Sequence, residues 1–68
     1  MKISARNQIA GTVVAVHPGA VNATVKVDIG NGTIVTSSIT NEAMEDLALT
    51  QGDRVTVIVK SSDVMIGK

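Results

Sequence analysis

A nine-residue stretch in the first half of the chain alternates strictly between apolar and polar side chains. Across residues 21–29 the odd positions hold Val21, Ala23, Val25, Val27 and Ile29, and the even positions hold Asn22, Thr24, Lys26 and Asp28. Successive side chains of a β-strand point to opposite faces, so this pattern is typical of an antiparallel strand with one buried face. The chain is therefore restricted to folds that contain a sheet covered on one side.

A second strand is predicted just before this one. Residues 8–16 are short, unbroken and rich in β-branched side chains, and Gly11 within them marks a bulge or a close approach of another backbone. Pro18 and Gly19 then fit positions i+1 and i+2 of a type II turn, in which glycine supplies the positive φ. The two strands are therefore predicted to form a hairpin.

The hydrophobic period changes after a third strand. Asn31 and Gly32 form the dipeptide favoured in tight hairpins, and they lead into a strand over residues 33–39. Thr40 can then cap a helix of about two turns over residues 41–47. The inward face of this helix is expected to carry Ala43, Met44 and Leu47.

Strand character resumes near the end of the sequence. It covers residues 54–59 and returns briefly over residues 64–66. Five strands with a helix between the third and the fourth match the order of an OB-type barrel. The predicted fold is all-β with one short helix, a five-stranded OB-type Greek-key barrel, in which residues 1–68 form a single domain.

The chain has few means of stabilising so small a core. A chain of 68 residues buries only roughly 60% of the surface that its unfolded form exposes. The absence of Cys excludes disulfides, and a single His without Cys argues against a structural zinc site. Hydrophobic residues nevertheless make up 44% of the chain, so we expect apolar surface to be buried between the subunits of a homo-oligomer.

Hydropathy and charge exclude several classes of partner. No run approaches the ~18–20 apolar residues of a membrane span, and the start of the chain turns polar too early for a signal peptide, so a cytoplasmic protein is expected. Six Lys and Arg balance six Asp and Glu, and there is no Phe, Tyr or Trp. Nucleic-acid binding that relies on a basic excess or on base stacking is therefore not expected.

Nothing in the sequence indicates catalysis. His17 precedes a turn, has no Cys to pair with and has no serine marked as its partner, so we interpret it as an exposed turn residue. The carboxylates of the predicted helix fit favourable charges near a helix start. The glycines lack the strand–glycine–helix context of a phosphate loop. We therefore expect no enzyme, no metal site and no catalytic cofactor.

Two polar segments near the two ends of the chain offer the donors that an oxyanion needs. Ser4 and Arg6 share parity in an extended backbone, so a hydroxyl and a guanidinium can reach one ligand. Lys60 and Ser61 are adjacent, so both serve one anion only if the strand bends or ends there. The spacing alone leaves two alternatives to an oxyanion site open. Arg6 could pair with a neighbouring carboxylate, and Lys60 could be an ordinary lysine at the edge of the sheet.

Taken together, these segments resemble the Mop family of molybdate- and tungstate-binding proteins, the molbindins. The resemblance covers essentially the whole chain, and it is carried by residues 1–8, by the strand over residues 55–60 and by residues 60–65. It implies an OB-type barrel that works as a hexamer, a trimer of dimers. It also implies molybdate or tungstate as the bound ligand between subunits, in intracellular storage and homeostasis of molybdenum.

The resemblance also implies which residues contact the oxyanion. The family motif falls on Ser4, Ala5 through its backbone, Arg6, Lys60 and Ser61. Thr40 at the predicted helix start matches a further contact position. Added candidates are Asn7, which completes the opening cluster, and Gly19 and Ala20, whose turn would contribute to pockets on a threefold axis.

The chemistry of the ligand agrees with this donor set. Molybdate at neutral pH is a fully deprotonated tetrahedral dianion, so it only accepts hydrogen bonds, and tungstate is nearly the same size. A site without an acceptor disfavours protonated phosphate, whose hydroxyl would go unpaired at a cost of about 1–3 kcal/mol, unless Asp63 points inward.

Two other functions stay open on the sequence. The OB-type strand order suggests single-stranded nucleic-acid binding, and the apolar excess suggests a purely structural assembly module.

Overall fold

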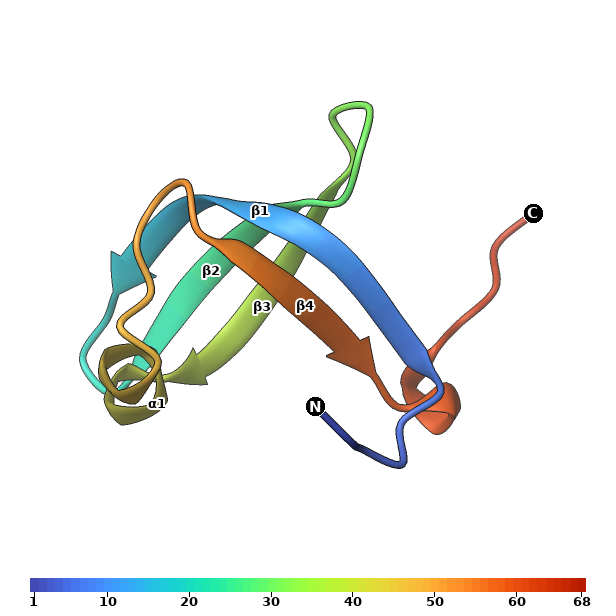
Figure 1. Cartoon of the computed structure of the whole chain (residues 1–68), viewed down its shortest axis with the longest axis horizontal. Helices are drawn as coiled ribbons and strands as arrows, with labels where there is room; N and C mark the ends of the chain where they lie inside the picture. Colours follow the sequence, from blue (N-terminus) through green and yellow to red (C-terminus); the bar gives the residue numbers. More distant parts are fainter.

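The chain folds into one curled antiparallel sheet with a short helix at one end, as a computed structural model of residues 1–68 shows (Figure 1). The elements in chain order are β1 (Asn7–Pro18), β2 (Asn22–Asp28), β3 (Ile34–Thr40), α1 (Asn41–Asp46), β4 (Arg54–Val59) and the 3-10 turn η1 (Ser61–Asp63). The strands lie in the order β3-β2-β1-β4. The first three strands are thus the predicted meander, and β4 pairs with the other edge of β1.

The predicted all-β class with one short helix between the third and fourth strands is confirmed, whereas the count of five strands is wrong. The sheet has four strands. Residues 64–66 belong to no strand, although Val64 has the extended dihedral angles φ −91° and ψ 120°. A strand exists only where a neighbouring strand accepts its hydrogen bonds, and no strand lies beside this segment.

The two hairpin turns differ from each other. Asn31 and Gly32 have φ values of 52° and 75°, which is the geometry predicted for an Asn-Gly hairpin. The type II turn predicted at Pro18 and Gly19 is wrong, because Pro18 still belongs to β1 and Gly19 has no left-handed φ. Space is what requires glycine there, since a Cβ on Gly19 would lie 2.5 Å from the carbonyl oxygen of Asn22.

A thin apolar layer on the inner face of the curled sheet forms the core. Val13, Val25 and Val27 pack together there, and Ala23 is fully buried. The predicted alternation is thereby confirmed at the centre of β2, while Val21, just outside the strand, is 71% exposed. Only 5 of the 68 residues are buried, so the isolated chain leaves most of its apolar side chains in contact with solvent.

Gly11 lets the strands approach at the centre of this layer. A Cβ there would lie 2.5 Å from Cγ1 of Val27 and 2.8 Å from the carbonyl oxygen of Asp28. The close approach predicted for Gly11 is therefore confirmed. The irregularity in strand register lies further along β1, between Val13 and Ala15.

The helix is capped as predicted but is shorter than predicted. Thr40 Oγ1 accepts a hydrogen bond from the Ala43 amide at 3.0 Å. Leu47 was expected to face inward, but it is the C-cap residue and is 66% exposed, because the helix ends at Asp46. No helix has the length and apolar character needed to cross a bilayer.

Candidate functional site

The segment that precedes β1 and the segment that follows β4 meet at one end of the sheet (Figure 1). The two strands are antiparallel, and Asn7 pairs with Val59 at their shared end. Arg6 and Lys60 therefore leave the sheet side by side. The hollow between the two segments is lined by Ile3, Ser4, Ala5, Arg6, Ile58, Lys60, Ser61, Ser62 and Asp63.

A sharp bend follows β4 and brings Lys60 and Ser61 to the same hollow. The Asp63 amide donates to the Lys60 carbonyl oxygen at 2.8 Å, which closes the first turn of η1. Lys60 itself is still extended, with φ −62° and ψ 136°. The strand thus ends directly after Lys60, which is the condition under which adjacent Lys and Ser residues can face one ligand.

Two amide side chains shape the N-terminal wall of the hollow. Asn7 Nδ2 donates to the Val59 carbonyl oxygen at 3.1 Å, and Gln8 Nε2 donates to the Ala5 carbonyl oxygen at 3.0 Å. Asn7 does not line the hollow, so its amide ties β1 to the end of β4. The sequence reasoning missed the role of Gln8, because a glutamine that folds back onto its own chain has no spacing signal.

The charged donors of the hollow have no partner within the chain. Arg6 and Lys60 take no part in the side-chain hydrogen bonds of the molecule, whereas Arg54 Nη1 donates to Thr12 Oγ1 at 2.8 Å. The alternative in which Arg6 pairs with a neighbouring carboxylate is therefore wrong for this structure. Free cationic donors beside hydroxyl groups form a set that an oxyanion can engage.

Ser62 and Asp63 also line the hollow. The sequence singled out Asp63 only as a residue that changes the selectivity if it points inward. Two cations and one carboxylate leave a net positive charge at the rim. The hollow therefore attracts anions overall, although it also contains one hydrogen-bond acceptor.

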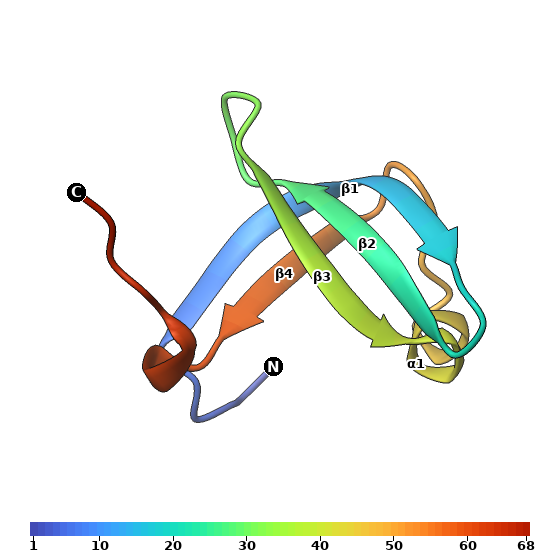
Figure 2. The ribbon, with the colours of Figure 1, turned by 180° about the vertical axis from the view of Figure 1, so that it is seen from behind.

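Thr40, Gly19 and Ala20 lie at the opposite end of the sheet from this hollow. Figure 2 shows α1 and the β1–β2 turn together there, far from η1. Asn41 joins them: its Nδ2 donates to the Gly19 carbonyl oxygen at 2.8 Å and its Oδ1 accepts from the Gly19 amide at 3.4 Å. Within one chain, the predicted contact residues Thr40, Gly19 and Ala20 therefore do not line the hollow that contains Arg6 and Lys60.

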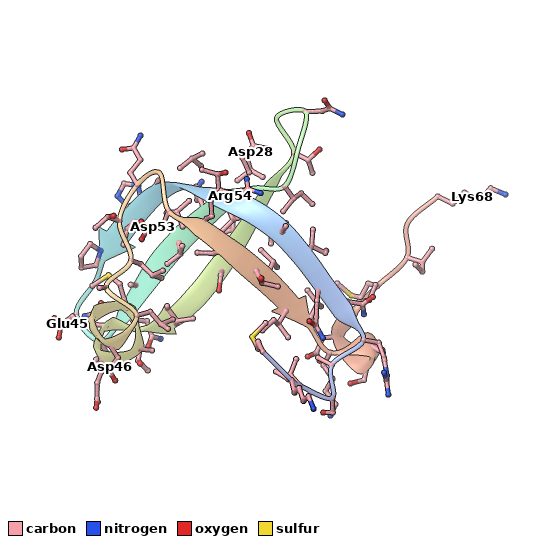
Figure 3. All side chains as sticks on the ribbon, in the orientation of Figure 1. Asp28, Glu45, Asp46, Asp53, Arg54 and Lys68 are labelled. Carbon is pink, nitrogen blue, oxygen red and sulfur yellow. The ribbon has the colours of Figure 1, made fainter.

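Acidic side chains gather on the short helix. Figure 3 shows Glu45 and Asp46 projecting from α1, while Lys68 lies at the tip of the C-terminal segment. No group of three or more His, Cys, Asp and Glu side chains is arranged to hold a metal ion.

The hollow is open on the side away from the chain. Its volume of about 630 Å³ is larger than that of a small tetrahedral anion. A small tetrahedral anion placed against Arg6 and Lys60 would therefore be contacted on one side only. A second wall is required for full coordination.

Comparison with known proteins gives the same family throughout. The TOBE domain family matches residues 3–66. Molybdenum-pterin-binding protein 3 of Clostridium pasteurianum is 50% identical over 66 residues, which are 97% of this chain and 97% of that protein.

Solved structures share the fold. A molybdate-binding protein from Sporomusa ovata matches with a TM-score of 0.93 and 38% identity over 100% of both chains. The cytoplasmic molybdate-binding protein ModG, solved with molybdate bound, matches with a TM-score of 0.89 and 40% identity over 96% of this chain and 46% of that chain. These matches confirm the OB-type fold class and the resemblance to the Mop family, and the chain belongs to the TOBE domain family.

Proposed function

We propose that this protein binds molybdate, and tungstate in the same way, for storage and homeostasis of molybdenum in the cytoplasm. The observation that carries this proposal is the convergence of unpartnered donors at one end of the sheet, where Ser4 and Arg6 meet Lys60 and Ser61. The names of the relatives, which are molybdenum-pterin-binding and molybdate-binding proteins, support the choice of ligand.

Each donor has a role that the chemistry of a dianion explains. Arg6 and Lys60 supply two positive charges against the two negative charges of the ligand. The hydroxyl groups of Ser4 and Ser61 and the backbone N–H of Ala5 supply further hydrogen bonds. A hydrogen bond to a charged group contributes about 1.5–3 kcal/mol, so the two cations dominate the affinity.

The second wall of the site comes from another subunit in this proposal. We expect a homo-oligomer, a hexamer built as a trimer of dimers, in which Thr40 of a neighbouring chain approaches the anion. Gly19 and Ala20 would face a separate pocket on the threefold axis. The small core supports assembly, because Val21, Met65 and Ile66 are 71%, 92% and 89% exposed in the single chain.

Asp63 is proposed to limit the affinity of the site and to weaken its discrimination against phosphate. Its carboxylate belongs to the lining of the hollow, where it repels a dianion and can accept a hydrogen bond from a protonated one. Asp63→Asn removes that charge while keeping the shape. We expect Asp63→Asn to bind molybdate more tightly.

The functional role is binding, and we expect no catalytic activity and no nucleic-acid affinity. His17 is exposed, and Arg6 and Lys60 are the only cations that line the hollow. Basic residues do not extend along the surface in the excess that a nucleic-acid backbone requires.

Calorimetric titration with molybdate, tungstate, sulfate and phosphate tests the proposal, on protein whose assembly state is set by native mass spectrometry. We expect molybdate and tungstate to bind with similar affinity and the other two anions to bind more weakly. Arg6→Ala should lower the molybdate affinity about 10- to 150-fold, the equivalent of about 1.5–3 kcal/mol. Lys26→Ala, which removes an exposed cation on β2, is the matched control. Unchanged binding in Arg6→Ala would contradict the assignment of the site.

A further inference from the structure

The six residues that precede β1 form one wall of the proposed anion site, but a single hydrogen bond holds them to the rest of the chain. Residues 1–6 belong to no helix or strand, and no backbone–backbone hydrogen bond involves them. Among the side-chain hydrogen bonds, only that from Gln8 Nε2 to the Ala5 carbonyl oxygen, at 3.0 Å, reaches this segment. The placement of Ala5 and Arg6 therefore depends on Gln8 more than on any other polar group.

Gln8 itself is anchored in the sheet. It is the second residue of β1 and pairs with Ile58 of β4. The bond from Asn7 Nδ2 to the Val59 carbonyl oxygen, at 3.1 Å, closes the same end of the ladder. Gln8 does not line the hollow, whereas Ala5 does. Gln8 therefore acts on a bound anion through the segment that it holds.

The bond acts on one peptide unit, that between Ala5 and Arg6. A trans peptide is planar, so its carbonyl and N–H groups point in opposite directions, and the chain contains no cis peptide bond. With the Ala5 carbonyl oxygen turned towards the amide of Gln8, the Arg6 N–H points away from it. This N–H donates to no acceptor in the chain. Gln8 thus engages the oxygen that would repel an oxyanion and leaves the N–H as a free donor.

We propose that Gln8 is a positioning residue of the anion site, which holds the Ala5–Arg6 peptide so that the segment is ordered before the anion arrives. This role rests on the proposed function, since it concerns the same site and the same class of ligand, a tetrahedral dianion. Without the bond, the segment would become ordered only on binding. The conformational entropy lost at that moment lowers the affinity.

Gln8→Met tests the proposal, because methionine has a similar length and no N–H donor in its side chain. We expect the molybdate affinity in calorimetric titration to fall about 2- to 12-fold, the effect of one net hydrogen bond. Gln8→Thr also lacks the amide and suits a β-strand. It should show the same loss, and it keeps the test valid if Gln8→Met fails to fold.

Gln51→Met is the matched control. Gln51 is the other glutamine of the chain, is exposed and lies outside the hollow. Its side chain makes no hydrogen bond. The molybdate affinity of Gln51→Met should equal that of the unaltered protein.

Nuclear magnetic resonance relaxation separates positioning from a merely structural role. In Gln8→Met without ligand, the amide order parameters of Ala5 and Arg6 should fall, and saturating molybdate should restore them. The amides of β2 should keep their order parameters, because the lost bond lies outside the ladder between β1 and β2. Circular dichroism at the temperature of the titration should show that the variants are folded.

Three outcomes would overturn the proposal. Affinity equal to that of the unaltered protein in both Gln8 variants means that the bond does not assist binding. An equal loss in Gln51→Met means that the effect is not specific to Gln8. Unchanged order parameters at Ala5 and Arg6 mean that other contacts hold the segment. Failure of the unaltered protein to bind molybdate would instead contradict the proposed function, so the two failures are distinguishable.

Discussion

The two ends of the sheet treat their polar groups in opposite ways. At the helix end, Thr40 caps α1, and Asn41 is bonded to both the amide and the carbonyl of Gly19. At the other end, the side chains of Arg6 and Lys60 make no hydrogen bond within the chain, although both line one hollow. Thr40 and Asn41 at the helix end stabilise the fold, whereas at the other end only the amides of Asn7 and Gln8 do so and the two cationic side chains are free for a ligand.

Lys60→Ala tests this contrast with the largest expected effect. We expect the molybdate affinity to fall about 10- to 150-fold, since one charge-assisted hydrogen bond to the dianion is lost. The melting temperature without ligand should not change, because the Lys60 side chain has no partner in the folded chain. Titration calorimetry and thermal melting measure the two quantities, and a large loss of stability without ligand would contradict the contrast.

Asn41→Ala should show the reverse behaviour at the helix end. Loss of two hydrogen bonds to Gly19 is expected to cost about 1–2 kcal/mol in the free energy of unfolding. For a chain of this size that is roughly 4–16 °C in melting temperature. Asn41→Asp, which keeps the acceptor for the Gly19 amide, should lose less. If Asn41→Ala lowered the molybdate affinity as much as Lys60→Ala does, the proposed difference between the two ends of the sheet would be contradicted.

Thr40 has two roles in this comparison, one structural and one in binding. It caps α1, and it is also proposed to contact the anion of a neighbouring chain. Thr40→Ala should lower the stability by about 1 kcal/mol. Thr40→Asp should keep the stability, since Asp is an equally good N-cap, but lower the molybdate affinity several-fold through repulsion. Melting curves and titrations of both variants separate the two roles, and unchanged affinity in Thr40→Asp restricts Thr40 to capping.

Ala48→Gly carries the smallest expected effect. Ala48 follows the helix with a φ of 50°, and its amide donates to the Glu45 carbonyl oxygen at 2.9 Å. A left-handed backbone conformation destabilises a non-glycine residue by about 1–2 kcal/mol, and the substitution by glycine removes this strain. Glycine also loses more conformational entropy on folding than alanine does, which offsets part of the stabilisation. We expect stability to rise by about 0.5–1 kcal/mol with unchanged molybdate binding. A lower melting temperature would contradict this account of the helix end.

Local patterns in the sequence were sufficient for the strand β4 and for the start of the helix. The predicted range of β4 agrees with the structure to the residue, and Thr40 caps the helix that follows β3. The prediction failed at residues 64–66, whose β-pattern has no pairing edge in the structure. It also failed at Gly19, where the glycine is required by the nearby Asn22 carbonyl rather than by a positive φ.

The candidate site shows the same division. Ser4, Arg6, Lys60 and Ser61 line one hollow because β1 and β4 pair in antiparallel register, which local spacing does not encode. The family resemblance carried that information. Thr40, the last residue of β3 and the N-cap of α1, lies outside this hollow. A site that spans two chains, as proposed, need not be complete in one of them.

The thin core has a consequence for how the protein behaves on dilution. In the isolated chain, the only buried residues are Gly11 and four residues with small apolar side chains. If contacts between copies supply the missing stabilisation, the folded fraction follows the total concentration of the chain through mass action. Dilution would then unfold the protein and release its cargo in one step, and the melting temperature should rise with protein concentration.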